Sequence, residues 1–332
     1  MKEDLLNLIQ KEFPIEERPF KTLAEKLNST EKEVLDLYGK LKEDKIIRQT
    51  SAIFDTKSLG YKSSLVAFKV NDIENAAKFI NTHPGVSHNY ERDNEYNLWF
   101  TIAVEPDSVL GLEKTVKIMA EKVNAIDYLI LPTKKMFKIS VQLDVKGDRA
   151  KKEEVKKTKK QNISLTKEDK NLINLLQKDI EVKEKPFEDI VKELQIDYET
   201  LQKESRKLKE AGVMRRFASI LYHRKAGFKA NAMVVWKIPE NLENEIEEIG
   251  YKIASFSAVS HCYQRPVYEK WQYPLFSMIH AKTKEEVDEV VKEISKETGL
   301  IDYKYLYSTK EFKKVRIQYF SPKFKEWERE NG

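Results

Sequence analysis

The amino-acid sequence predicts an α+β fold built by tandem duplication. Each half is expected to contain a winged helix-turn-helix module followed by a ferredoxin-like β-α-β-β-α-β domain. A seven-residue phrase occurs twice, as VSHNYER at Val86–Arg92 and as VSHCYQR at Val259–Arg265. Around both phrases, the same order of helix and strand patterns recurs. We therefore expect two related halves in one chain of 332 residues, which is too long for a single compact core.

Each half begins with three short stretches in which apolar residues recur at helical spacing. Thr30 followed by Glu33 forms a capping-box sequence at the start of the third stretch. Alternation over Ile46–Phe54 then predicts a short hairpin, which would complete the winged module. The apolar residues that define these helices are Leu5, Leu8, Ile9, Leu23, Ala24, Leu27, Val34, Leu37 and Leu41, and in the second half Leu172, Leu175, Leu176, Ile190, Val191, Leu194, Leu201 and Leu208.

The rest of each half alternates between strand and helix patterns, which predicts the ferredoxin-like order. A basic strand is expected to close each half, at Lys134–Val141 and at Lys310–Tyr319. The predicted elements of the first half are Ser63–Val70, Ile73–Thr82, Val86–Arg92, Tyr96–Glu105, Asp107–Asn124 and Ile126–Pro132. Those of the second half are Asn231–Ile238, Leu242–Ala254, Ala258–Arg265, Tyr273–Ala281, Thr283–Thr298 and Ile301–Ser308.

These patterns predict five segments along the chain. The helix-turn-helix modules are expected at 1–57 and 165–224, and the ferredoxin-like domains at 58–143 and 225–322. Residues 144–164 are rich in Lys and Glu and are expected to form a charged linker.

Composition excludes several classes of protein. The chain has 60 Lys and Arg residues against 55 Asp and Glu residues, so its net charge of +5 allows an acidic ligand without requiring nucleic acid. A single cysteine excludes disulfides within the chain and cysteine-cluster metal sites. No signal-peptide pattern or membrane-length apolar run occurs, so we expect a soluble cytoplasmic protein with no membrane partner. Sequences typical of phosphate loops, dinucleotide-binding loops and zinc proteases are also missing.

The repeated phrase preserves polar chemistry instead of an apolar pattern. In a strand, Val86, His88, Tyr90 and Arg92 would share one face, as would Val259, His261, Tyr263 and Arg265. An imidazole, a phenol and a guanidinium on one face suggest a site for an anionic, aromatic ligand. A half-buried, hydrogen-bonded structural histidine is the alternative for either position alone, but the recurrence of the whole pattern favours a ligand site.

Further candidate binding residues are aromatic or basic. Amphipathic aromatic side chains suit the walls around a flat ligand, and a guanidinium can hold a carboxylate through two parallel hydrogen bonds. Arg48 and Arg215 occupy equivalent positions in the two halves and rank above the lysines. The candidates are Tyr96, Trp99, Trp271 and Tyr273 among the aromatic residues, and Arg48, Arg215, Arg216, Lys310 and Arg316 among the basic residues.

A helix-turn-helix followed by this β-α-β-β-α-β order resembles the feast/famine (Lrp/AsnC) regulators. Two longer phrases are more specific. His88–Arg92 with Tyr96–Phe100 resembles one subunit type of the siroheme decarboxylases, and His261–Pro266 with Trp271 and Tyr273–His280 resembles the partner type. The resemblance spans nearly the whole chain apart from the linker, so it implies two subunits fused into a covalent pseudo-dimer.

This resemblance implies anaerobic removal of carboxyl groups from two acetate side chains of siroheme, giving 12,18-didecarboxysiroheme on a route to heme b or heme d1. It implies no cofactor beyond the iron that siroheme itself carries. We expect His88 and His261 to act as general acids, or one of them to ligate the siroheme iron. Arg92 and Arg265 would hold the carboxylates, and Tyr90 and Tyr263 would orient them.

The competing class is a DNA-binding regulator or a heme-responsive sensor. The third helix of each half would then need an excess of basic residues to neutralise phosphates. Thr30–Leu41 carries a net negative charge and Asp197–Glu210 is neutral, so DNA binding is disfavoured. The sequence leaves open which half removes which carboxyl group, and whether fused chains associate as a homodimer.

Overall fold

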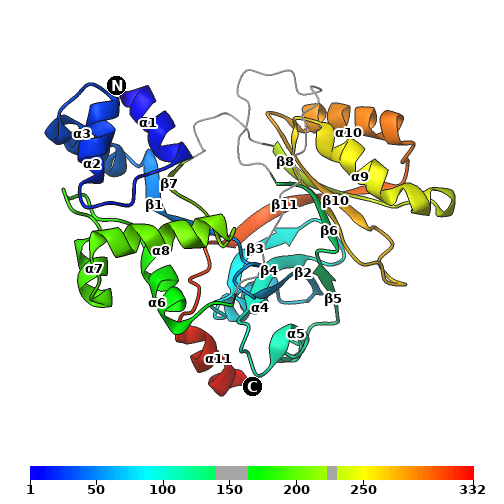
Figure 1. Cartoon of the computed structure of the whole chain (residues 1–332). Helices are drawn as coiled ribbons and strands as arrows, with labels where there is room; N and C mark the ends of the chain where they lie inside the picture. The colour runs from blue at the N-terminus through cyan, green and yellow to red at the C-terminus, as the bar shows by residue number, and fades with distance from the viewer. Residues whose placement is uncertain (140–163, 223–229) are drawn as a thin grey trace.

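The computed structural model describes residues 1–139, 164–222 and 230–332. Nearly all of the predicted linker, 144–164, lies outside the described residues. The chain forms a helical region at one end and two sheet-and-helix units at the other (Figure 1). This arrangement confirms the predicted α+β tandem of helix-turn-helix and ferredoxin-like parts.

The six expected helices of the helix-turn-helix modules are present. Thr30 and Glu33 form the predicted capping box, because the Thr30 hydroxyl accepts from the Glu33 amide and the Glu33 carboxylate accepts from the Thr30 amide. The helices of the first half are α1 (Lys2–Lys11), α2 (Pro19–Lys26) and α3 (Glu31–Glu43), and those of the second half are α6 (Lys167–Leu176), α7 (Glu188–Leu194) and α8 (Tyr198–Glu210).

The expected hairpin at Ile46–Phe54 is wrong. This segment is one strand, β1 (Ile47–Phe54), and it pairs antiparallel with its counterpart in the other half, β7 (Met214–Leu221). Ser51 lies opposite Ala218 in this ladder, so equivalent positions of the repeat meet across a local twofold axis. No glycine is present to form a tight turn within β1, and its backbone groups are satisfied by the other half instead.

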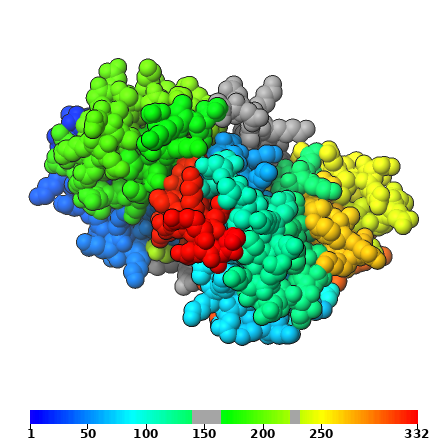
Figure 2. All heavy atoms as spheres, turned by 90° about the horizontal axis from the view of Figure 1, so that it is seen from below, coloured from blue at the N-terminus to red at the C-terminus, as the bar shows by residue number. Residues whose placement is uncertain are grey.

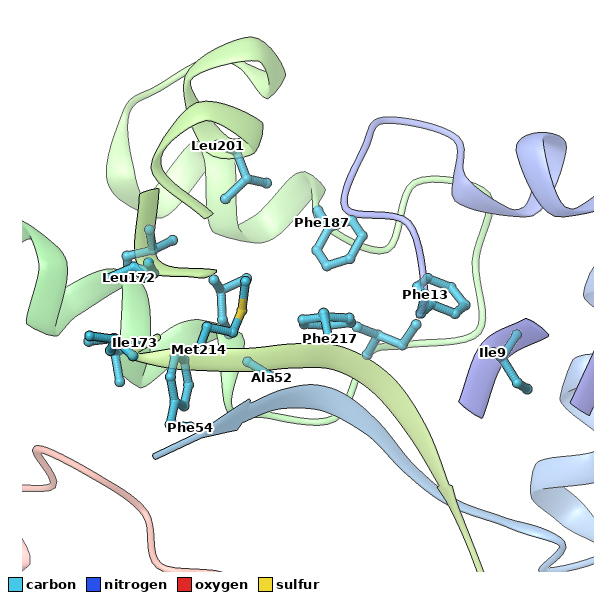
Figure 3. Packing of buried hydrophobic residues seen from close by; sticks show 14 of the residues in the cluster. Ile9, Phe13, Ala52, Phe54, Leu172, Ile173, Phe187, Leu201, Met214 and Phe217 are labelled. Carbon is cyan, nitrogen blue, oxygen red and sulfur yellow. The ribbon is translucent and has the colours of Figure 1, made fainter. Parts of the chain in front are cut away.

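The two helix-turn-helix modules therefore share one apolar core above the β1–β7 ribbon (Figure 3). Phe13 from the first half packs against Phe217 on β7, with ring centroids 6.2 Å apart, and Phe187 approaches the same ring at 5.4 Å. All three side chains are at most 2 % exposed. Because this core draws on both halves, we infer that neither module keeps its apolar surface buried alone.

The ferredoxin-like domains join in one sheet with the strand order β5-β2-β4-β3-β11-β8-β10-β9-β6. Helices cover one face of each domain and the opposite faces pack together. The first domain contains β2 (Lys62–Lys69), α4 (Ile73–Ile80), β3 (Val86–Arg92), β4 (Leu98–Val104), α5 (Gly111–Lys122) and β5 (Asp127–Pro132). The second contains β8 (Ala230–Trp236), a 3-10 helix η2 (Glu240–Glu245), α9 (Ile246–Ser255), β9 (Val259–Gln264), β10 (Leu275–Ala281) and α10 (Lys284–Thr298).

The basic closing strands are exchanged between the halves. Strand β6 (Lys135–Ile139) of the first half pairs with β9 of the second. Strand β11 (Tyr303–Lys314) pairs first with β8 of its own half and then, from Ser308, with β3 of the first half. The exchange protects strand edges that would otherwise remain unpaired. The exchanged strands also fix the positions of the two domains relative to each other.

A C-terminal helix, α11 (Lys323–Asn331), was not expected from the sequence. It lies between the second helix-turn-helix module and the first ferredoxin-like domain (Figure 2). Phe324 joins the core of the helical modules and Trp327 joins the core beneath α4 and α5. Within the described part of the chain, no helix combines the length and apolar character needed to span a membrane.

Candidate functional site

Both copies of the repeated phrase contain a bulge directly before the histidine. In β3, Val86 pairs with Ile102 but His88 pairs with Thr101, and β9 shows the same shift between Val259 and His261. The valines pack with the helices on the outer face. The expectation that valine shares a face with histidine, tyrosine and arginine is therefore wrong. The extra residue turns the histidine towards the opposite face, as β-bulges often do beside functional sites.

A serine fixes each of these histidine rings. The Ser87 hydroxyl lies 2.9 Å from His88 Nδ1, and the Ser260 hydroxyl lies 2.7 Å from His261 Nδ1. Among the described residues, neither Nε2 atom has a hydrogen-bond partner in the protein. Each imidazole therefore presents Nε2 as the atom available to a ligand.

Histidine, tyrosine and arginine form the same stacked ladder in both halves. The ring centroids of His88 and Tyr90 are 6.2 Å apart, and those of His261 and Tyr263 are 6.1 Å apart. Each guanidinium lies next to the tyrosine ring. The Cζ atom of Arg92 is 5.6 Å from the Tyr90 ring centroid, and the Cζ atom of Arg265 is 5.0 Å from the Tyr263 ring centroid. The structure thus brings together the six residues expected to be catalytic as two matched triplets.

The arginines of these ladders are buried, with Arg92 5 % and Arg265 8 % exposed. Each donates a hydrogen bond of 2.5 Å to a carbonyl of the opposite half, Arg92 to Leu306 and Arg265 to Leu131. Burial lowers the pKa of both guanidiniums to about 10, so they remain charged at neutral pH. Their Nε atoms have no hydrogen-bond partner among the described residues.

The imidazoles are neutral at pH 7. Burial is the main cause that lowers the pKa of His88 to about 4, and the positive charges of Lys314, of His261 when it is protonated, and of Arg48 add to it. Burial also lowers the pKa of His261. A neutral imidazole can donate its lone pair to a metal, and it becomes a general acid once it has taken up a proton. Both roles expected for these histidines are thus chemically available.

A cavity of about 680 Å³ opens at His88, a volume suited to a large organic ligand. Its wall is built from β1, the start of β3, the end of α6 and the chain that follows β11. The lining residues are Arg48, Gln49, Ala52, Ile53, Phe54, Thr56, Ser87, His88, Asn174, Gln177, Lys178, Asp179, Val315, Arg316, Ile317, Gln318, Tyr319, Ser321 and Pro322.

The cavity wall is cationic. Arg48, Lys178 and Arg316 outnumber the single carboxylate of Asp179, which already accepts hydrogen bonds from Lys42 and from the Thr50 amide. The pKa of Arg316 is lowered to about 10, first by reduced hydration and second by the positive charge of Arg48. Solvent still reaches the Arg316 side chain. Such crowding of positive charge favours an anion in the space between.

The other predicted basic residues are placed differently. Arg215, the sequence counterpart of Arg48, is paired with Asp55 at 2.6 Å. Arg216 does not line the cavity, but its charge contributes to lowering the pKa of Arg316. Lys310 is exposed and forms an ion pair with Glu74.

The four predicted aromatic residues meet where the two ferredoxin-like domains pack against each other, outside the set that lines the cavity. The Trp99 and Trp271 rings are 5.5 Å apart, and Tyr96 and Tyr273 lie 6.0 Å and 5.3 Å from Trp271. All four are at most 9 % exposed. In the structure they hold the two halves together.

Several residues at the site were not among those predicted. They include Ser87, Ser260, His280, Lys314 and, apart from Arg316, the cavity wall after β11. The serines carried a usable signal, since Val-Ser-His occurs in both phrases. Nothing in the sequence pointed to Lys314, because it lies beside His88 only through the exchange of β11 between the halves.

Comparisons with known proteins agree with this architecture. An AsnC-like ligand binding domain family matches residues 58–138 and 225–313. A siroheme decarboxylase NirDL-like HTH domain family matches residues 2–48 and 169–215. Together the two families account for both halves of the chain.

Full-length relatives share the fused arrangement. A siroheme decarboxylase from Hydrogenobacter thermophilus is 45 % identical over 328 residues, which is 98 % of this chain and 97 % of that protein. The siroheme decarboxylase NirDL subunit of Paracoccus denitrificans is 31 % identical and covers 93 % of this chain and 94 % of its own.

A crystal structure of the siroheme decarboxylase NirDL superposes with a TM-score of 0.80 at 40 % identity, covering 99 % of this chain and 97 % of that one. The same enzyme has been crystallised with an iron-uroporphyrin III analogue, again with a TM-score of 0.80. With this agreement in sequence and structure along nearly its whole length, the chain belongs to the siroheme decarboxylase family, in its fused two-subunit form.

Proposed function

We propose that this protein binds siroheme and removes CO2 from two of its acetate side chains, giving 12,18-didecarboxysiroheme. The observation that carries the proposal is the cationic cavity with a neutral imidazole in its wall. Siroheme is flat and polyanionic, so a large cavity that holds Arg48, Lys178 and Arg316 suits both its size and its charge.

The chemistry requires one proton for each carboxyl group lost. The bond between the methylene carbon and the carboxylate breaks, CO2 leaves, and the electron pair remains on the methylene carbon, where the macrocycle delocalises it. A protonated imidazole then donates its proton to that carbon, which becomes a methyl group. General acid catalysis of this kind typically contributes about 100- to 10,000-fold in rate.

His88 and His261 are the proposed acids because their Nε2 atoms have no partner in the described protein. His88 is neutral without ligand, since burial lowers its pKa to about 4. Carboxylates bound beside it favour the protonated form and raise that pKa. The substrate would thus recruit the proton that its own reaction consumes.

Ligation of the siroheme iron by one of these histidines is the alternative role for Nε2. The iron belongs to the substrate, and a neutral imidazole is a suitable ligand for it. The two roles differ in their consequences, because an iron-bound Nε2 has no proton to donate. Replacing an iron-ligating histidine changes the absorption spectrum of bound siroheme, whereas replacing an acid leaves the spectrum unchanged and stops the reaction.

The geometry supports different roles for the arginines than those expected from the sequence. The predicted carboxylate ligands Arg92 and Arg265 use their Nη1 atoms on backbone carbonyls and stack on Tyr90 and Tyr263. Arg48 and Arg316 stand in the cavity wall, so we assign the carboxylates to them. Arg92 and Arg265 then keep the tyrosine and histidine of each ladder in place.

DNA recognition has little support from the third helices. Lys42 of α3 is paired with Asp179 at 2.5 Å, and Lys207 of α8 is paired with Asp169 at 3.0 Å. Charges neutralised in this way contribute little to phosphate binding. The helix-turn-helix modules instead supply β1, which forms part of the cavity wall.

Anaerobic incubation of the full-length protein with siroheme, followed by mass spectrometry of the tetrapyrrole, tests the proposal. We expect loss of one and then two CO2 units, and no loss with His88→Ala and His261→Ala combined. If a folded wild-type protein binds siroheme tightly but the tetrapyrrole loses no mass, the proposed decarboxylase activity is contradicted and a sensor role is favoured.

A further inference from the structure

The two halves differ around their matched histidines. In the second half, the Ser260 hydroxyl lies 2.7 Å from His261 Nδ1 and also 2.7 Å from His280 Nε2. In the first half, the Ser87 hydroxyl contacts His88 Nδ1 at 2.9 Å and the Thr101 hydroxyl at 2.7 Å. Two residues after Thr101, at the position that corresponds to His280, β4 carries Ala103.

A serine between two ring nitrogens has a restricted choice. Its hydroxyl has one proton to donate, and the Met278 carbonyl, at 3.5 Å, is a much weaker acceptor than either nitrogen at 2.7 Å. The hydroxyl therefore donates to one nitrogen and accepts from the other. If His280 Nε2 carries a proton and donates it to Ser260, then Ser260 donates to His261 Nδ1. The proton of a neutral His261 must then reside on Nε2, the atom without a protein partner among the described residues.

The first half has no such restriction. The Thr101 hydroxyl both donates and accepts, so it adapts to either direction of the Ser87 hydroxyl. His88 is therefore free to carry its proton on either nitrogen. With His280 as the donor to Ser260, the protein fixes the tautomer of the histidine in one half alone.

We propose that His280 is a positioning residue that acts through Ser260 to hold the proton of His261 on Nε2. The role rests on the proposed function, in which His261 Nε2 delivers a proton to the methylene carbon. The proton leaves Nε2 for the carbon, and as it departs Nδ1 takes the hydroxyl proton of Ser260. His280 supplies Ser260 in turn. It is neutral without ligand, because burial lowers its pKa to about 4, so it takes up a proton from solvent when the carboxylates of the substrate bind. The chain of three residues then passes one proton and His280 ends neutral.

Nitrogen NMR of the full chain labelled with 15N-histidine tests this arrangement without any substrate. The sequence contains five histidines, so few signals have to be assigned, and His261→Ala identifies those of His261. In the wild type we expect His261 in a single tautomer with its proton on Nε2. His280→Ala should give a mixture of tautomers at His261.

His280→Gln is the matched variant, because its amide N–H still donates to Ser260 but cannot titrate. We expect it to keep the wild-type tautomer of His261. Ser87→Ala is the control in the other half, and it should shift the signals of His88 while leaving those of His261 unchanged. Unchanged His261 signals in a folded His280→Ala variant would overturn the proposal.

Kinetics supply a second, separate readout. We expect His280→Ala to lower kcat for the decarboxylation that depends on His261 by roughly 10- to 100-fold, the range typical when the group that orients a functional histidine is lost. KM for siroheme should change less than about threefold, because His280 orients an acid and does not bind the substrate. If the wild type does not decarboxylate siroheme, the proposed function fails, while the NMR result still decides the role of His280.

Discussion

The guanidinium of Arg92 donates a hydrogen bond to the carbonyl oxygen of Leu306, across the boundary between the two halves, at 2.5 Å. Arg265 makes the reciprocal contact with Leu131. The ladders that present the two histidines are therefore each anchored in the opposite half. Fusion of the halves in one chain makes this mutual dependence permanent, so the histidine sites and the pseudo-dimer interface are parts of one structure.

Arg92→Ala is expected to lower the free energy of unfolding by roughly 1–3 kcal/mol, because it removes the hydrogen bond between the halves and leaves a cavity at a buried position. Arg92→Met fills the same space and removes a buried charge whose Nε has no partner among the described residues, so it should be closer to the wild type. Urea unfolding at fixed pH measures both. Arg329→Ala, at an exposed position on α11, should change the value by less than about 0.5 kcal/mol. Equal effects of the Ala and Met variants would show that lost packing matters less than the lost hydrogen bond.

The sequence predicted the elements of the fold well because each has a strong local pattern. The three helices of each module and the β-α-β-β-α-β order follow from apolar spacing, and Val86–Arg92 is a strand with the predicted bounds. Pairing partners follow no such local rule. Since the halves repeat one pattern, β1 can satisfy its backbone equally well within one half or with β7, and only the assembled structure decides between them.

The candidate site was predicted only in part, because it too depends on which strands pair. His88 and Arg48 were identified from residue type and recurrence, and Arg316 from residue type alone; the three do meet in one cavity. Their meeting depends on β1, β3 and the chain after β11, which come from distant parts of the sequence. The bulge before each histidine could not be predicted either. A one-residue shift moves the following side chains to the other face of the strand, but it does not change the amino-acid composition.

Buried histidines should make the protein sensitive to acid. Burial lowers the pKa of His83 to about 3, and that of His88 and His280 to about 4, against an ordinary value of 6.5. Between pH 6.5 and 4 the unfolded chain binds more protons than the folded one, so the free energy of unfolding falls as the pH falls. The stabilisation is complete above about pH 6.5 and declines towards pH 4. Urea midpoints at pH 7 and pH 5 should show this loss.

His83→Gln isolates one contribution to this acid sensitivity. His83 is 1 % exposed, and its Nδ1 accepts a hydrogen bond from the Gly85 amide, a role that the glutamine oxygen can take over. We expect the variant to lose roughly 2 kcal/mol less than the wild type between pH 7 and pH 5. An identical loss in both proteins would show that His83 does not remain neutral in the folded state.

Binding of a polyanionic tetrapyrrole should take up protons. His88 is neutral without ligand, and carboxylates placed beside it raise its pKa from about 4. Calorimetric titration with siroheme near pH 6, in two buffers of different ionisation enthalpy, measures the number of protons bound. We expect a net uptake that shrinks in His88→Gln. No uptake, together with a spectral change of the bound siroheme in His88→Gln, would instead indicate that His88 ligates the iron.

Arg48 and Arg215 form a matched pair that tests the cavity itself. They occupy equivalent positions in the repeat, but Arg48 lines the cavity while Arg215 is paired with Asp55 at 2.6 Å. A charge-assisted hydrogen bond to a carboxylate is worth roughly 1.5–3 kcal/mol, so Arg48→Ala should weaken siroheme binding by about 10- to 100-fold. Arg215→Ala should change it less than about threefold. Added salt should weaken binding by the wild type more than by Arg48→Ala, because the variant has lost one of the charges that salt screens. Equal losses of affinity in the two variants would place the tetrapyrrole outside this cavity, at a position shared by both halves.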